Sequence, residues 1–178
     1  TNNAAAIQQA IDEASAAGGR VVIPQGKYLS GTLVLKSNID FHLEKGAVLI
    51  SSLNQEDIMD FAKLFEDDNA CTGWDGFLFA CHEENITISG EGVIYGQGDK
   101  VFIDDDVDGG AHECPLSVAA FRPRTTFLED VTNLTVRDIT IQDAAFWTLH
   151  MAGCHHVRVQ DIKILNDVRG ANNDGIDP

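Results

Sequence analysis

The stretch Asn133-Leu-Thr-Val-Arg-Asp-Ile-Thr-Ile-Gln-Asp143 returns 23 residues later as His156-Val-Arg-Val-Gln-Asp-Ile-Lys-Ile-Leu-Asn166. When the two copies are aligned, Val136 falls on Val159 and Ile141 falls on Ile164. Within each copy apolar and polar residues alternate, which is the period of a strand with one buried face. A strand pattern that recurs at a fixed spacing of this size predicts stacked repeats.

The same pattern occurs twice earlier, as Asn38-Ile-Asp-Phe41 and Asn85-Ile-Thr-Ile88. Asparagines 38, 85 and 133 lie 47 and 48 residues apart, close to twice the first spacing, so further repeats fit between them. Leucine-rich repeats have a similar length, but their Leu-x-x-Leu-x-Leu signature is missing. A repeat too short for a helix but long enough for several short strands predicts an all-β fold, a parallel β-helix in which each rung buries its apolar side against the next.

The first residues predict a helix over 3–17 that caps this solenoid. Ile7 and Ile11 form an apolar stripe at helical spacing with neighbouring alanines. Asn2 or Asn3 can cap its start, and Gly18 can end it. A helix at this place would cover the open core and the unpaired backbone of the first rung.

The strands expected after this helix are 20–23, 31–36, 38–43 and 47–51, separated by Gly or Pro turns. Residues 53–76 break the rhythm and are predicted to be an inserted loop with a short helix over 58–65. Insertions on a solenoid tend to lie on its binding face, although an ordinary surface loop is an equal alternative. Arg122-Pro123-Arg124 could face a carboxylate ligand or pair with acids of the inserted loops.

Composition excludes several classes of function. The 28 acidic and 12 basic side chains give a formal net charge of −16, which would repel the phosphates of nucleic acids. No apolar run approaches the roughly 18 residues of a membrane span, and no signal peptide is visible. The glycine-rich run 90–98 lacks the lysine and the helix of a phosphate-binding loop, so no cofactor is predicted.

No metal site is predicted either. The acidic run 104–108 lacks the spaced ligands of an EF-hand loop, which favours a solvated loop over a calcium site. Cys71, Cys81, Cys114 and Cys154 match no zinc pattern. Cys71 and Cys81 could close a small disulfide loop, but the favoured interpretation is that the cysteines are free thiols packed as small apolar residues.

Four segments in this order resemble glycoside hydrolase family 28, the polygalacturonase family. They are Asn85-Ile-Thr-Ile-Ser-Gly-Glu-Gly-Val-Ile-Tyr-Gly-Gln-Gly98, Arg122-Pro123, Phe146-Trp-Thr-Leu-His150 and Asn172-Asn-Asp-Gly-Ile-Asp-Pro178. The resemblance implies a right-handed parallel β-helix that hydrolyses α-1,4-galacturonosyl bonds of pectin with inversion. An inverting enzyme needs an acid and a base roughly 6.5–9.5 Å apart. Carboxylates on adjacent rungs, about 4.8 Å apart, can span that gap with a sideways offset.

The resemblance also implies a catalytic residue. Asp174 takes the place of the aspartate in the family's Asn-Thr-Asp motif, which positions and deprotonates the attacking water. Near it, His150, Asn172 and Asp177 are the predicted substrate-binding residues, each with a structural role as the alternative. His150 is expected beside Asp174 on the outward face with Thr148, while Trp147 and Leu149 point into the core.

The chain also departs from the family pattern. Asn173 replaces the usual Thr, Tyr95 stands where many members have Asp, and Met151 stands where Pro is frequent. The family's paired aspartates, Gly-His-Gly motif and Arg-x-Lys motif are absent from the sequence up to Pro178. We therefore expect one β-helix domain over 1–178 that forms the N-terminal part of a longer catalytic domain.

Three alternatives remain open at this stage. A hydrolase of the same fold could act on rhamnogalacturonan or another uronate-containing glycan. A pectate lyase is a weaker alternative, because it would need a calcium cluster and a basic arginine. A non-catalytic β-helix could bind polysaccharide. The expected partner is in each case an acidic polysaccharide, not nucleic acid or membrane, and the family resemblance implies a secreted or periplasmic protein.

Overall fold

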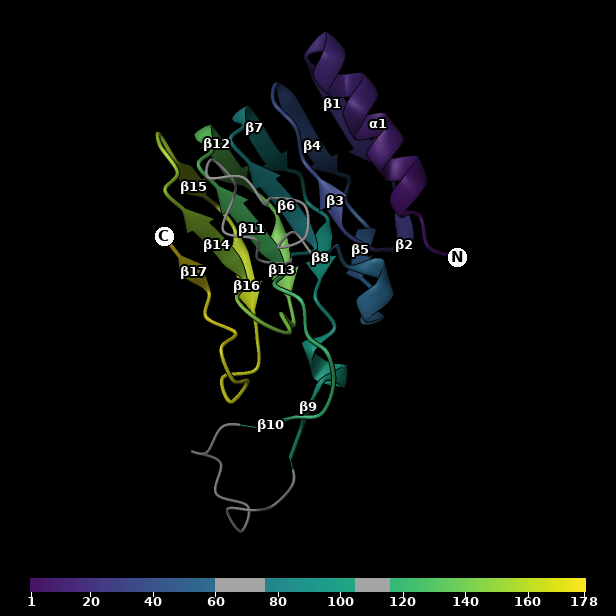
Figure 1. Ribbon diagram of the computed structural model, residues 1–178, viewed down its shortest axis with the longest axis vertical. Coiled ribbons are helices and arrows are strands. Elements are labelled where there is room, and N and C mark those ends of the chain that lie inside the picture. The colour runs from purple at the N-terminus through teal and green to yellow at the C-terminus, as the bar shows by residue number, and fades with distance from the viewer. Residues whose placement is uncertain (60–75, 105–115) are drawn as a thin grey trace.

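Three parallel sheets run along a right-handed β-helix, and each turn of the chain adds one strand to each sheet (Figure 1). The computed structural model describes residues 1–59, 76–104 and 116–178 of the chain. Sheet 1 contains β1 (Gly19–Ile23), β4 (Ile39–Leu43), β7 (Glu84–Ser89), β12 (Thr132–Arg137) and β15 (Arg158–Gln160). Sheet 2 contains β2 (Gly26–Ser30), β5 (Ala47–Ser51), β8 (Val93–Tyr95), β13 (Thr140–Gln142) and β16 (Lys163–Leu165). Sheet 3 contains β3 (Leu33–Val34), β6 (Leu78–Cys81), β11 (Thr126–Glu129), β14 (Leu149–Ala152) and β17 (Ile176–Asp177).

The register within these sheets confirms the repeat predicted from the sequence. Val136 pairs with Val159 in sheet 1, and Ile141 pairs with Ile164 in sheet 2. Inward residues therefore stack in rows, and their burial along β4 and β5 alternates with a period of two. The strand expected over 31–36 is limited to β3. The strand β2, which lies just before it, was not among the expected strands.

The predicted capping helix is α1 (Ala4–Ala17), which lies over the first rung at one end of the stack (Figure 1). Ile7 and Ile11 are buried in the core. The side chain of Gln8 donates to Val34 O at 2.9 Å and accepts from Val34 N at 2.8 Å. A side-chain amide thus satisfies both backbone groups on the open edge of β3, which removes a site for edge-to-edge pairing.

The ends of α1 follow the predicted caps. Asn2 Oδ1 accepts from Ala4 N at 2.9 Å, while the backbone of Asn3 occupies the N-cap position. Gly18 ends the helix at φ 67°, where a residue without a Cβ is least strained. Among the described residues, no helix combines the length and the apolar character needed to cross a membrane.

An asparagine ladder marks the corner between sheet 3 and sheet 1. Asn85 Nδ2 donates to Asn38 Oδ1 at 2.9 Å, and Asn133 Nδ2 donates to Asn85 Oδ1 at 3.0 Å. All three residues have left-handed backbones, with φ of 63°, 56° and 59°, and His156 continues the row at 54°. Asparagine tolerates this conformation better than most side chains, so the residue serves both the turn and the bond to the next rung.

The corners differ in length. Sheet 1 joins sheet 2 through the short turns 24–25, 44–46, 90–92, 138–139 and 161–162. The long connections, 52–77, 96–125 and 166–175, all lie between sheet 2 and sheet 3. The second of them includes the 3-10 turn η3 (Gly98–Lys100) and the antiparallel pair β9 (Phe102–Ile103) and β10 (Ser117–Val118). The first includes the 3-10 turn η1 (Gln55–Asp57), and most of the helix expected over 58–65 lies outside the described residues.

The cysteines correct one expectation. Cys81 forms a disulfide, so the prediction of a free thiol is wrong at this position. Cys154 is a free thiol packed against the main core, as predicted. Cys71, Cys114 and most of the acidic run 104–108 lie outside the described residues.

The ladder predicts a difference between two substitutions at Asn85. Asn85→Gly removes hydrogen bonds worth about 0.5–1.5 kcal/mol each but keeps a backbone that accepts positive φ. Asn85→Ala removes the same bonds and adds roughly 1–2 kcal/mol of backbone strain. Urea unfolding should therefore show a lower free energy of unfolding for Asn85→Ala than for Asn85→Gly. Thr87→Ala, on the outer face of the same strand, is the control, and equal losses for both Asn85 variants would contradict the role of φ.

Candidate functional site

A row of side chains on the outer surface of sheet 3 leads to the predicted site. Register places Val34, Phe79, Phe127, His150 and Asp177 side by side on successive rungs. Phe79 and Phe127 form a small cluster separate from the main core, so this row faces away from the solenoid interior. The row changes from aromatic to ionisable side chains as it approaches β17.

His150 continues the aromatic stack. Its ring lies 4.7 Å from that of Phe127 and 4.6 Å from that of Trp147, which meets it edge-on. Burial and, secondarily, the charge of Arg124 lower the pKa of His150. The lowered pKa favours the neutral imidazole, which can both donate and accept a hydrogen bond.

The prediction that His150 pairs laterally with Asp174 is wrong. His150 is paired with Asp177, and Leu149 is paired with Ile176. The corner loop 166–175 is longer than the turn expected from the repeat, which shifts the register by three residues. Asp174 instead lies at the end of that loop, where its carbonyl accepts from Thr148 N at 3.1 Å.

Asn166 clamps the backbone just before Asp174. Its Nδ2 donates to Asn173 O at 2.8 Å and to Thr148 Oγ1 at 2.7 Å, and its Oδ1 accepts from Ala144 N at 3.0 Å. One side chain thus joins three segments at the corner. Asn166 was not predicted as a site residue, although its place directly after an alternating strand is a weak signal for a turn or cap.

The rest of the loop is held by Asn173 and Arg122. Asn173 Nδ2 donates to Asp167 O at 2.8 Å, so the asparagine that replaces the family threonine stabilises the loop from within. Arg122 donates through Nη1 to Ala171 O at 2.5 Å and through Nη2 to Asn172 Oδ1 at 2.9 Å. Asn172 therefore has a structural contact beside the site.

Cations and aromatic rings form a surface cluster next to this loop. The guanidinium carbon of Arg122 lies 4.4 Å from the ring centre of Phe146, and that of Arg124 lies 4.9 Å from Phe146 and 5.0 Å from Trp147. Trp147 is therefore half-exposed and outside the main core, contrary to the prediction. Its neighbour Leu149 is in the core as predicted, but Thr148 is fully buried where an outward position was expected.

Two carboxylates with different surroundings close the site. Asp174 is exposed, and no described residue forms a hydrogen bond with its carboxylate. Asp177 is half-buried, and within the described ranges its Oδ2 atom is buried without a hydrogen-bond partner. Burial, followed by the charge of Asp174, raises the pKa of Asp177. Such a pair places a proton on one carboxyl group more readily than on the other.

The model of the glycosyl hydrolases family 28 matches residues 15–178, nearly the whole chain. The chain belongs to glycosyl hydrolases family 28. A Vitis vinifera protein named "Probable polygalacturonase" is 27% identical over 100% of this chain and 36% of its own length. An exo-poly-alpha-D-galacturonosidase from Dickeya chrysanthemi is 36% identical over 56% of this chain and 18% of its own length. The chain thus spans about a third or less of these curated relatives.

The fold agrees with solved structures of the family. A polygalacturonase from Erwinia carotovora superposes with a TM-score of 0.77, covering 100% of this chain and 49% of that one at 21% identity. At this identity the likeness establishes the parallel β-helix.

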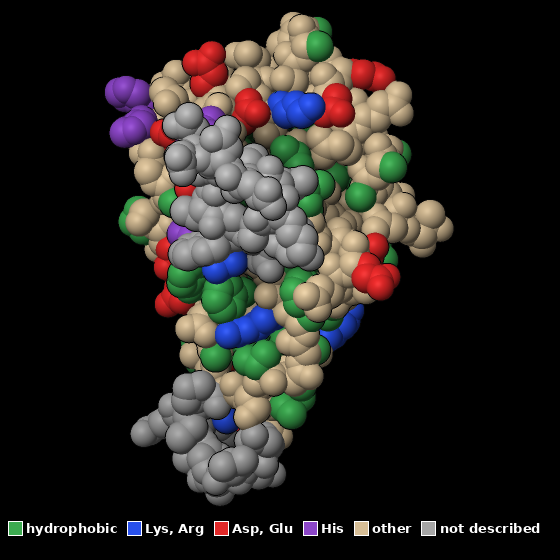
Figure 2. Space-filling view, viewed as in Figure 1, with side chains coloured by type: hydrophobic (Ala, Val, Ile, Leu, Met, Phe, Trp, Pro, Cys, Tyr) green, Lys and Arg blue, Asp and Glu red, His purple; other side chains and the backbone are tan. Residues whose placement is uncertain are grey.

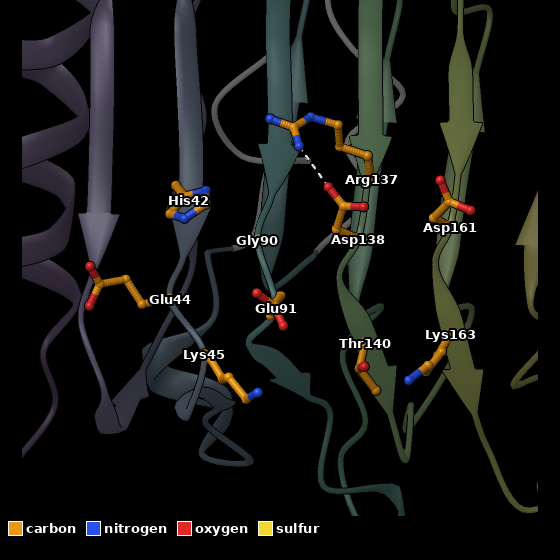
Figure 3. Close-up of a pocket in the computed structure, with 10 residues that line it drawn as sticks. All are labelled: His42, Glu44, Lys45, Gly90, Glu91, Arg137, Asp138, Thr140, Asp161 and Lys163. Carbon is orange, nitrogen blue, oxygen red and sulfur yellow. Dashed lines mark hydrogen bonds and ion pairs between the residues drawn. The ribbon is translucent and has the colours of Figure 1, made fainter.

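A groove among the described residues of this family 28 chain lies away from Asp174. It encloses about 1040 Å³ at the corner between sheets 1 and 2 (Figure 3). Its lining includes His42, Glu44, Lys45, Gly90, Glu91, Arg137, Asp138, Thr140, Asp161 and Lys163. Acids and bases are mixed there, and Arg137 is paired with Asp138 at 2.6 Å. None of the predicted site residues lines this groove.

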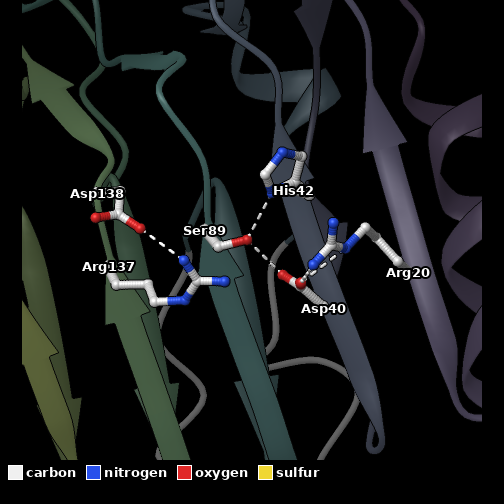
Figure 4. A network of polar contacts seen from close by, with 6 residues as sticks. All are labelled: Arg20, Asp40, His42, Ser89, Arg137 and Asp138. Atoms are coloured by element: carbon white, nitrogen blue, oxygen red, sulfur yellow. Dashed lines mark hydrogen bonds and ion pairs between the residues drawn. The ribbon is translucent and has the colours of Figure 1, made fainter.

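Next to the groove, a polar network ties three strands together (Figure 4). Ser89 Oγ donates to Asp40 Oδ1 at 2.5 Å and contacts His42 Nδ1 at 2.8 Å, while Arg20 pairs with Asp40 at 2.7 Å. These residue types resemble a hydrolase triad, but the serine stands between the histidine and the acid. The Ser89 hydroxyl already donates its hydrogen bond to Asp40 and not to His42, so we interpret the network as a tie between rungs. Within the described ranges no cluster of His, Cys, Asp or Glu could hold a metal ion.

The raised pKa of Asp177 gives a prediction about pH. A carboxyl group whose folded pKa is raised favours folding below its unfolded pKa and loses that contribution as pH rises through the folded pKa. Asp177→Asn should therefore raise the melting temperature relative to wild type at pH 7, and this gain should shrink below pH 4. Asp161→Asn, an exposed acid on another corner, is the control. Melting curves that show the same gain at both pH values would contradict the burial of this carboxyl group.

Proposed function

We propose that the protein of which this chain is part hydrolyses α-1,4-galacturonosyl bonds of polygalacturonan with inversion, and that Asp174 activates the attacking water. Membership of family 28 and the names of the relatives support this substrate class. The observation that carries the proposal is the contrast at Asp174. Hydrogen bonds from Asn166 and Thr148 fix the backbone around it, while its carboxylate is exposed and not engaged by any described residue.

The contrast suits a general base. A fixed backbone limits where the carboxylate can lie, and an unengaged carboxylate can accept a proton from water. Its neighbours supply substrate contacts in this proposal: His150 as a neutral hydrogen-bonding group, and Asn172 and Asp177 at the edge of the same loop. The general acid would come from a carboxyl group about one rung further along the helix, at a distance that leaves room for the water.

We further propose that residues 1–178 form the N-terminal part of a longer β-helix domain that works outside the cytoplasm. The chain covers 36% of the length of the Vitis vinifera relative, which supports a longer domain. The disulfide at Cys81 fits an oxidising compartment, such as the periplasm or the extracellular space. An acidic pectin-type polysaccharide is the proposed partner.

Reducing-sugar release from polygalacturonic acid tests this function in the full-length protein. Asp174→Asn should lower kcat by about 10²–10⁴-fold, because the amide cannot accept the proton of water. Asp161→Asn should leave the rate unchanged. NMR of the first product formed should show the β-anomer at the new reducing end, the inverted configuration.

Other outcomes distinguish the alternatives. Full activity of Asp174→Asn would refute its role as the base. Release from rhamnogalacturonan but not from polygalacturonic acid would assign another glycan, and an unsaturated product would indicate a lyase. Binding of polygalacturonate without any release would indicate a non-catalytic module.

A further inference from the structure

Arg122 has no ion-pair partner among the residues that the structure describes. It forms hydrogen bonds with Ala171 O and Asn172 Oδ1, both neutral acceptors, and stacks on Phe146. In contrast, three of the other described arginines, Arg20, Arg137 and Arg169, are each paired with an aspartate.

The environment of Arg122 suits an incoming carboxylate. A guanidinium has five N–H donors in a planar fork, and the described bonds of Arg122 use only two of them. Stacking on Phe146 and the bonds to the loop fix the plane of this fork, so little side-chain entropy remains to be lost on binding. The guanidinium is partly buried, and this incomplete solvation of its charge lowers the pKa of Arg122. A carboxylate ligand would accept charge-assisted hydrogen bonds from the guanidinium and so replace the lost solvation.

The position of Arg122 also suits a polyanion. Its two hydrogen-bond acceptors precede Asp174 by three and two residues on the same loop. The whole chain carries a formal charge of −16, so an anionic chain needs local cations where it meets the protein. In the view of Figure 2, Lys and Arg side chains lie among hydrophobic ones in the lower half, while acidic and basic side chains lie together near the top and further acidic ones lie at both edges.

We infer that Arg122 binds the carboxylate of a galacturonosyl unit next to the unit processed at Asp174, and so helps to select uronate over neutral sugars. This inference rests on the proposed function. It assigns to Arg122 a second role beside its structural contact with the loop, because the same guanidinium can hold Asn172 with one edge and a carboxylate with another.

A thermodynamic cycle between side chain and substrate tests the inference. Full-length Asp174→Asn serves as a non-hydrolysing parent, and calorimetry measures its affinity for oligogalacturonate and for the fully methyl-esterified oligomer. Arg122→Met and Arg122→Lys are then added to this parent. Arg137→Met, which removes an arginine paired with Asp138 at another corner, is the matched control.

The expected result is that the preference for free carboxylates over methyl esters depends on the Arg122 side chain. Arg122→Met should weaken binding of oligogalacturonate by about 10- to 100-fold, the effect of removing a charged hydrogen bond. It should weaken binding of the ester much less, so the ratio of the two affinities should fall. Arg122→Lys should keep part of that ratio, and Arg137→Met should keep all of it.

Each other result would overturn the inference in a distinct way. If Arg122→Met weakens binding of both oligomers equally, the side chain only supports the loop. Circular dichroism and melting curves identify a variant that has lost its fold. If Arg122→Met has done so, the ratio of the two oligomer affinities is measured for Arg122→Lys instead. If the parent binds neither oligomer, the proposed function fails. If the parent prefers oligogalacturonate to the ester and Arg122→Met leaves that preference unchanged, only the role of Arg122 is refuted.

Discussion

Parallel pairing in strict register between successive rungs is the interaction on which this structure depends. A slip of one residue would move a whole row from the core to the surface, so the inward rows, such as Leu49, Ile94 and Ile141, fix every strand at once. The asparagine ladder also fixes the register between rungs, at one corner and outside the core. The same pairing places His150 beside Asp177. The geometry of the site is therefore set by contacts that lie far from it.

Sequence patterns revealed the solenoid because its signals repeat. Three signals in the sequence all indicate a capped β-helix. They are the alternation along single strands, the asparagines 47 and 48 residues apart, and the apolar stripe before Gly18. The corners carry no such repetition. His150 was assigned the wrong lateral neighbour because loop 166–175 is longer than the repeat allows, and nothing in its composition reveals this length as an altered register.

Side chains at corners were also the hardest to predict. Trp147 is large and apolar, which favours burial, but Arg124 offers its ring a surface partner through cation–π contact. Asn166 is a common turn residue, and only three-dimensional contacts show that it reaches the carbonyl before Asp174. At Cys81, spacing alone could not separate a disulfide from a packed thiol.

Neutral and charged groups have different surroundings at the candidate site. Neutral groups, Asn166, Thr148 and Asn173, hold the loop through amide and hydroxyl bonds. The charged groups Arg122, Asp174 and Asp177 keep unused hydrogen-bonding capacity among the described residues, and of the three only Asp174 is exposed. In the groove at the corner between sheets 1 and 2, acids and bases are mixed, and Arg137 is paired with Asp138.

The restriction of long connections to the corner between sheets 2 and 3 has a consequence for how such a protein can change over evolution. Turns at the other corners carry the asparagine ladder and the close contacts between rungs, so insertions there would disturb the stack. At the permissive corner, segments such as 52–77 and 96–125 can lengthen or shorten while every strand keeps its neighbours. Loops at this corner can therefore be exchanged on an unchanged scaffold, with little effect on the folding of the β-helix.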